Sequence, residues 1–176
     1  MANYACPRER LRVAWGMPRS DAAQQIITTL RLEPLAQEGG FYRQTWGGEA
    51  GSAILFLITE NAFSALHRLA YTEVWHFHAG DGVEHVQLDP ATGELRVTRL
   101  GSDILRGETP QCVVPGGVWQ GARWVSGSSP KGSAGYALLG CTMAPAWDAA
   151  RFELGNRDAL LGSFPAAADW IRALTR

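Results

Sequence analysis

Hydrophobic and polar residues alternate in short segments over most of the chain, which is the pattern of β-strands. Six such segments lie at residues 63–69, 72–78, 84–89, 94–100, 111–115 and 135–143. Turn-forming Gly, Pro, Asp and Asn residues separate them, with no helical pattern between them. An alternating segment at residues 41–46 and a continuous apolar segment at residues 52–59 add two strands before them. This succession predicts an antiparallel sandwich or barrel.

Helices are predicted only near the two ends of the chain. Ser20 is a suitable N-cap, and Ile26, Ile27 and Leu30 after it share one helical face. Pro34 is expected to end this helix, because the residue before a proline is disfavoured in helical conformation. The segment FPAAADWIRAL near the end of the sequence predicts a closing helix.

Length and composition restrict the class of protein. The 176 residues suit one domain, expected over residues 20–176 behind an arm at residues 1–19. The net charge is −1 with no basic stripe, so we expect no nucleic-acid partner. No apolar segment approaches the roughly 20 residues that span a bilayer, so we expect no membrane partner. Cys6, Cys112 and Cys141 are odd in number and far apart, which favours reduced thiols and a cytoplasmic location.

The stretch LHRLAYTEVWHFHAG, residues 66–80, contains three of the four histidines and one glutamate. Side chains alternate between the two faces of a strand. Glu73 therefore shares a face with Trp75 and Phe77, whereas His76 and His78 share the opposite face. His67 lies on the preceding strand. The pattern separates two candidate sites, His67 with Glu73 and His76 with His78.

Several motifs in this sequence resemble those of the cupins, a superfamily of jelly-roll proteins. The first cupin motif runs Gly-x5-His-x-His-x3-4-Glu-x6-Gly, and His67, Leu69, Glu73 and Gly80 follow its spacing. The second runs Gly-x5-Pro-x-Gly-x2-His-x3-Asn, and Pro115, Gly117, Gln120 and Trp124 follow that one. Leu69 and Gln120 stand where the motifs have histidines, and Asn61 and Thr109 stand where they open with glycine.

One branch of the superfamily, the cupin-like proteins classed as a domain of unknown function, resembles this chain more closely. The segments EGGFYRQT, SALHR, EVWHFHAGD, VVPGGVWQ and GCTMAPAW carry this resemblance, which covers roughly residues 21 to 170. It implies an all-β double-stranded β-helix, the cupin jelly roll, with a short N-terminal helix and a C-terminal helix. It also implies a homodimer and a barrel pocket for a small molecule. The apolar segment at residues 52–59 is a candidate for the surface covered on pairing.

The resemblance places His67, Glu73 and Gln120 at positions that hold a metal ion in other cupins. Gln is a poor substitute for a histidine ligand, so we expect no cofactor, and at most a weakly bound divalent metal at these three residues. His76 and His78 could share a metal as residues i and i+2 of a strand. We favour instead two outer-face histidines at a dimer interface or under a helix.

Three functions remain open. The preferred one is binding of a nucleotide or a phosphorylated or nucleotide-linked sugar, with ligand contacts from Tyr42, Arg43, His67, Glu73, Trp75, Phe77 and Gln120. Tyr42 and Arg43 are adjacent on one strand, so only one of them can point inward. The second is a metal-independent sugar epimerase or isomerase, with catalytic His67 as base and Tyr42 or Glu73 as acid. The third is a metal-dependent cupin enzyme.

Overall fold

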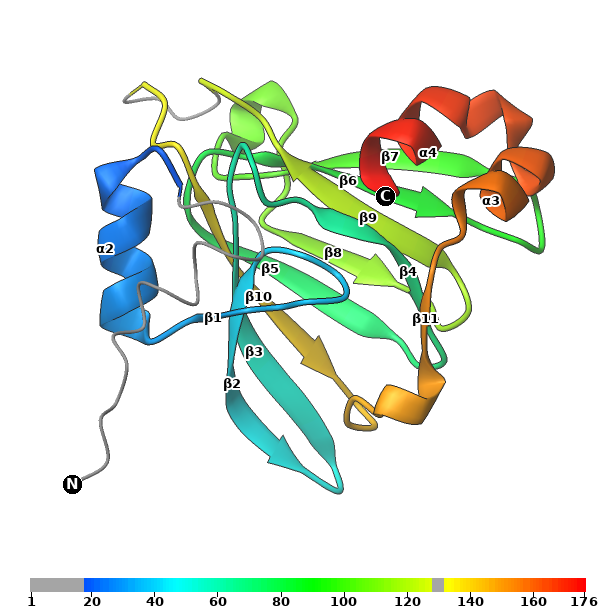
Figure 1. The fold of residues 1–176 in the computed structure, drawn as a ribbon, viewed down its shortest axis with the longest axis horizontal. Coiled ribbons are helices and arrows are strands. Elements are labelled where there is room, and N and C mark those ends of the chain that lie inside the picture. Colours follow the sequence, from blue (N-terminus) through cyan, green and yellow to red (C-terminus); the bar gives the residue numbers. More distant parts are fainter. Residues whose placement is uncertain (1–17, 128–131) are drawn as a thin grey trace.

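The computed structural model describes residues 18–127 and 132–176, which form two facing β-sheets with helices on their outer faces (Figure 1). The first sheet has the order β1-β2-β3-β10-β5-β8, with β1 Glu33–Pro34, β2 Phe41–Gly48, β3 Gly51–Ile58, β10 Ala137–Met143, β5 Glu73–Gly80 and β8 Gln111–Val114. The second has the order β11-β4-β9-β6-β7, with β11 Phe152–Leu154, β4 Ser64–Leu69, β9 Trp119–Trp124, β6 Val83–Leu88 and β7 Leu95–Leu100. Neighbouring strands are antiparallel.

The two sheets bury one apolar cluster between them. Phe56, Trp75 and Leu139 contribute to it from the first sheet, and Val83 and Leu100 from the second. This arrangement is a jelly roll, so the predicted fold class is confirmed. All the strands expected from alternation are present. The predicted arm lies almost wholly outside the described residues, as does Cys6.

Helix α2, Asp21–Leu30, covers the outer face of the first sheet. Ser20 caps it, accepting a hydrogen bond from the Ala23 N–H at 3.3 Å. The helix ends earlier than predicted, because Arg31 adopts a left-handed conformation (φ 54°) and its N–H bonds back to the last turn. Pro34 lies beyond it in β1.

The outward side chains of β3 pack under this helix. Leu57 is buried in the same cluster as Ile27, and Leu55 packs against that cluster. The chain's own helix therefore covers this face at Leu55 and Leu57, and whether a second subunit covers the rest of residues 52–59 stays a prediction.

Two short helices, α3 Arg157–Ser163 and α4 Ala168–Leu174, cover the outer face of the second sheet. Leu160, Ile171 and Leu174 pack there against Val86 and Leu88 of β6. The closing helix was predicted, but α3 and strands β1, β9 and β11 were not. The described part of the chain also contains short 3-10 helices, η1 Ile104–Arg106, η2 Ala149–Arg151 and η3 Pro165–Ala167. No helix in the described part of the chain is long and apolar enough to cross a membrane.

Asp81 holds residues 133–135, which precede β10, against the barrel. Its Oδ2 accepts hydrogen bonds from the backbone N–H groups of Ala134 (2.8 Å) and Gly135 (2.9 Å) and from Ser133 Oγ and Trp124 Nε1, both at 3.0 Å. The residue is fully buried. Bonds to a buried carboxylate are among the stronger hydrogen bonds in proteins.

We therefore expect Asp81→Asn to lower the free energy of unfolding by roughly 2 kcal/mol, because a neutral amide accepts these bonds more weakly. Urea unfolding at pH 7 measures the loss. Asp169→Asn is the matched control, since the Asp169 side chain is fully exposed and should change stability by less than about 0.5 kcal/mol. Equal effects of the two substitutions would contradict this role for Asp81.

Candidate functional site

Polar side chains form a row on the inner face of the second sheet. His67 of β4 lies opposite Gln120 of β9, and Gln120 lies opposite Gln87 of β6. Residues directly opposite each other on paired strands point to the same face. All three are buried, with exposed fractions of 2%, 1% and 6%. The row faces Glu73 and Trp75 of the first sheet.

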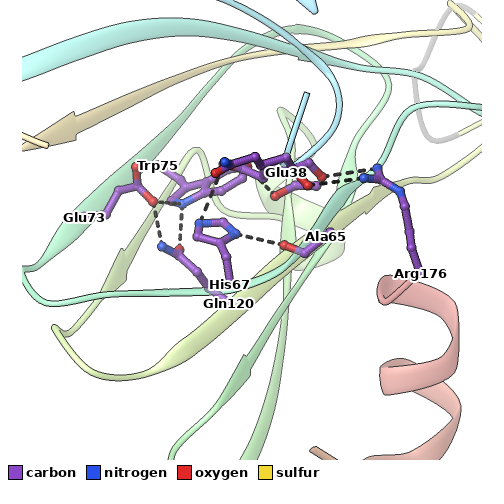
Figure 2. A network of polar contacts seen from close by, with 9 residues as sticks. Glu38, Ala65, His67, Glu73, Trp75, Gln120 and Arg176 are labelled. Carbon is purple, nitrogen blue, oxygen red and sulfur yellow. Dashed lines mark hydrogen bonds and ion pairs between the residues drawn. The ribbon is translucent and has the colours of Figure 1, made fainter. Parts of the chain in front are cut away.

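Glu73, Trp75 and Gln120 form one hydrogen-bonded cluster between the sheets (Figure 2). Gln120 Nε2 donates to Glu73 Oε2 at 2.7 Å, and Trp75 Nε1 donates to the same oxygen at 3.0 Å. Trp75 Nε1 also lies 2.9 Å from Gln120 Oε1. The structure thus brings together three residues that the sequence predicts for the site.

His67 has a defined orientation beside this cluster. Its Nδ1 lies 2.8 Å from the carbonyl oxygen of Ala65. A carbonyl only accepts hydrogen bonds, so Nδ1 carries a proton and donates it. Nε2 then faces Glu38, with 3.9 Å between Nε2 and Glu38 Oε2 (Figure 2). The ring of Phe152 stacks on the imidazole with 5.5 Å between centroids. This leaves Nε2 as the nitrogen that can exchange a proton.

The surroundings of Glu73 bring the pKa of its carboxyl group close to neutral pH, which suits proton transfer. Burial raises its pKa to about 7, against the lowering effect of nearby His67; Glu38 raises the pKa further, and the hydrogen bonds from Gln120 and Trp75 lower it. A carboxyl group with this pKa can either donate or accept a proton near pH 7.

Tyr42 and Phe77 point to the interior, and Arg43 points away from it. Both aromatic side chains are half-buried and pack against the cluster between the sheets. Arg43 is exposed and lies opposite Leu55, whose side chain is on the helix-covered outer face. Of the two adjacent candidates Tyr42 is therefore the inward one, and the ligand contact predicted for Arg43 is wrong for this site.

His76 and His78 lie on the outer face of the first sheet. His76 Nε2 is 2.9 Å from Thr142 Oγ1, and its Nδ1 is 3.2 Å from Gln111 Nε2. Partial burial, and to a lesser extent His78, lower the pKa of His76. His78 is exposed. Neither histidine contributes to the interior site.

Two further residues of the site were not predicted from the sequence. Glu38 lies in a loop before β2, and only the three-dimensional fold brings it to His67. His85 of β6 is fully buried, with its ring 4.8 Å from that of Trp75 and its Nδ1 3.8 Å from Cys112 Sγ. The alternation along β6 could have identified His85, because it places His85 and Gln87 on the same face of the strand as the core residue Val83.

The donor set does not suit a transition metal. His67 offers one imidazole nitrogen, Glu73 Oε2 already accepts two hydrogen bonds, and the amide of Gln120 is bonded at both ends. Within the described residues, no three His, Cys, Asp or Glu side chains are placed to hold a metal ion.

Comparisons with known proteins agree with this architecture. The model of a family described as Cupin superfamily (DUF985) matches residues 24–155. The structure is similar to that of a Shewanella oneidensis protein, with 33% identity, a TM-score of 0.77 and coverage of 88% of this chain and 97% of that one. It is also similar to a hypothetical protein from Leishmania major, with 28% identity, a TM-score of 0.77 and coverage of 87% and 98%.

More distant similarity shows the fold alone. A cupin 2 domain-containing protein from Halorhodospira halophila has 16% identity and a TM-score of 0.54, with coverage of 78% of this chain and 83% of that one. A comparison with curated proteins gave no match.

Proposed function

Because the chain belongs to the DUF985 family of the cupin superfamily and carries a buried polar network between its sheets, we propose that it binds a small molecule at His67, Glu73 and Gln120. The observation that carries this proposal is the buried carboxyl of Glu73 beside an oriented imidazole. A buried ionisable group is costly for folding, so one with a strongly perturbed pKa is a candidate for function.

We infer that the ligand is a nucleotide or a phosphorylated or nucleotide-linked sugar. Tyr42 and Phe77 offer aromatic faces that can stack on a base or a sugar ring. The carboxyl, amide and imidazole groups suit hydroxyls. With Arg43 on the other face, the phosphate of such a ligand has to be bound away from this residue.

A thermal-shift screen of nucleotides, sugar phosphates and nucleotide-linked sugars tests the proposal. One class should raise the melting temperature, because a ligand that binds only the folded state stabilises it. His67→Ala should weaken binding of that ligand at least tenfold, about 1.4 kcal/mol. His78→Ala is the matched control, since His78 is exposed on the outer face. Unchanged affinity in both His67→Ala and Glu73→Gln would refute the assigned site.

A second candidate, a metal-independent sugar epimerase or isomerase, is favoured by the pKa of Glu73. In this reaction His67 Nε2 removes a proton from the carbon next to a sugar carbonyl. Glu73 or Tyr42 returns a proton, to the opposite face of the same carbon in an epimerisation or at the neighbouring position in an isomerisation, so no atoms are lost. His67→Ala and Glu73→Gln should then abolish turnover, whereas under pure binding they only weaken affinity.

The homodimer and the cytoplasmic location stay predictions. Sedimentation of the purified protein tests whether it is a dimer.

A further inference from the structure

The loop at residues 35–40 lies against the start of β4 and delivers Glu38 to the site. The Ala65 N–H donates to the carbonyl oxygen of Glu38 at 2.8 Å, and Ser64 Oγ donates to Glu38 Oε1 at 2.6 Å. Gly39 adopts φ 104°, and a Cβ atom there would lie 2.3 Å from the carbonyl oxygen of Phe63. Only glycine allows this close approach, so the loop position is built into the sequence.

Arg176 also holds the loop at residues 35–40 in place. Its guanidinium points toward Glu38 (Figure 2) and donates to the backbone carbonyls of Gln37 and Glu38, each at 3.3 Å. It also lies 4.9 Å from the centre of the Phe63 ring. Contacts of the backbone of Glu38 with Ala65 and Arg176 thus position its carboxylate, of which Oε1 is occupied by Ser64.

The remaining carboxylate oxygen, Oε2, faces His67 Nε2 across 3.9 Å. When the imidazole is neutral, with its Nδ1–H bonded to Ala65, both facing atoms are hydrogen-bond acceptors; a protonated His67 would instead pair with the Glu38 carboxylate. The separation is too long for a direct hydrogen bond. His67 is only 2% exposed, and Nε2 makes no hydrogen bond with any of the described residues. Two acceptors held side by side can both be satisfied by two adjacent donors.

Building on the proposed small-molecule site, we propose that Glu38 belongs to it and that Glu38 Oε2 and His67 Nε2 accept hydrogen bonds from two adjacent hydroxyls of a sugar. A phosphate group does not fit between these atoms, because it brings acceptor oxygens and negative charge to a carboxylate. Any phosphate of the ligand is therefore bound away from the pair.

Histidine nitrogen NMR tests the acceptor pair without a ligand. In protein labelled with ¹⁵N-histidine, the neutral form of His67 should carry its proton on Nδ1 and leave Nε2 bare. Protonation of Nε2 in the neutral form would overturn the proposal, because that atom would then be a donor. This measurement uses the wild-type chain, so it does not depend on how any variant folds.

Pairs of ligands that differ by one hydroxyl test the sugar contact. For the sugar phosphate or nucleotide-linked sugar with the largest thermal shift, Glu38→Gln should weaken binding at least tenfold, since the Gln amide can place a donor where an acceptor is needed. The deoxy analogue lacking the contacted hydroxyl should bind more weakly and be insensitive to Glu38→Gln. Glu94→Gln, at an exposed position, is the control.

The outcomes separate this inference from the proposed function. If His67→Ala abolishes binding while Glu38→Gln leaves it unchanged, the site stands and the role of Glu38 is overturned. Competition by inorganic phosphate that disappears in Glu38→Gln would also overturn it. If the ligand binds equally well to His67→Ala, Glu73→Gln and the wild type, the proposed site itself is wrong.

Discussion

At pH 8 the Glu73→Gln variant should be more stable than the wild type by about 3 kcal/mol, although the substitution changes the centre of the site. Burial raises the pKa of Glu73 from 4.5 to about 7 in the folded protein. Between these values the folded state holds a proton that the unfolded chain has released. Stability from this residue is therefore complete below pH 4.5 and is lost as the pH rises through 7. Gln never ionises, and its amide oxygen can still accept from Trp75 and Gln120.

Urea unfolding of both proteins between pH 4 and pH 8.5 measures this difference. The two stabilities should converge below pH 4.5, and the gain at pH 8 corresponds to roughly 6–12 °C in melting temperature for a chain of this size. Glu94→Gln, at an exposed position, should show no such gain. A Glu73→Gln variant less stable than the wild type at pH 8 would mean that its neighbours hold Glu73 as a carboxylate. The assignment of Glu73 as a neutral-pH acid would then fail.

Alternation made most of the strands predictable, and its failures have local causes. Strand β9 was missed because Gly121 and Arg123 interrupt its apolar pattern. A Cβ at Gly121 would lie 3.0 Å from the carbonyl oxygen of Ser64, so close packing on β4 explains the glycine. Helix α3 is only seven residues long and includes Gly162, which weakens a helical pattern. Packing on the second sheet stabilises it instead.

The site was predictable only where neighbouring strands carry it. Strand parity placed Glu73 and Trp75 on one face, and the resemblance to the cupin motifs placed His67 and Gln120 with Glu73 at pocket positions. Glu38 has no such signal, because it lies in a loop 26 residues before Ser64, its hydrogen-bond partner. The loop could have been identified as unusual from Gly39 and Gly40 alone, but its partner could not.

His85→Phe should show the opposite pH dependence to Glu73→Gln. Burial lowers the pKa of His85 to about 3, with a smaller raising effect of Gln120 and lowering effects of His67 and Arg96. Below pH 6.5 the imidazole of His85 binds a proton in the unfolded chain but not in the folded state. The wild type therefore loses stability as the pH falls toward 3. The loss amounts to about 3 kcal/mol by pH 4.5. Phe fills a similar volume beside Trp75 and does not titrate, so the variant should not lose this stability.

In the wild type the contributions of Glu73 and His85 to the pH dependence of stability oppose each other between pH 4.5 and 6.5. In this range Glu73 is protonated only in the folded state, and His85 is protonated only in the unfolded state. Relative to the wild type, His85→Phe should therefore gain stability on acidification through this window, and Glu73→Gln should lose it. Urea unfolding at pH 4.5, 5.5 and 6.5 measures both trends, and His85→Gln repeats the test if Phe does not fold. Parallel curves for wild type and His85→Phe would show that His85 is protonated in the folded protein. The buried Nε2 of His85, which has no hydrogen-bond partner among the described residues, would then need an acceptor rather than a donor.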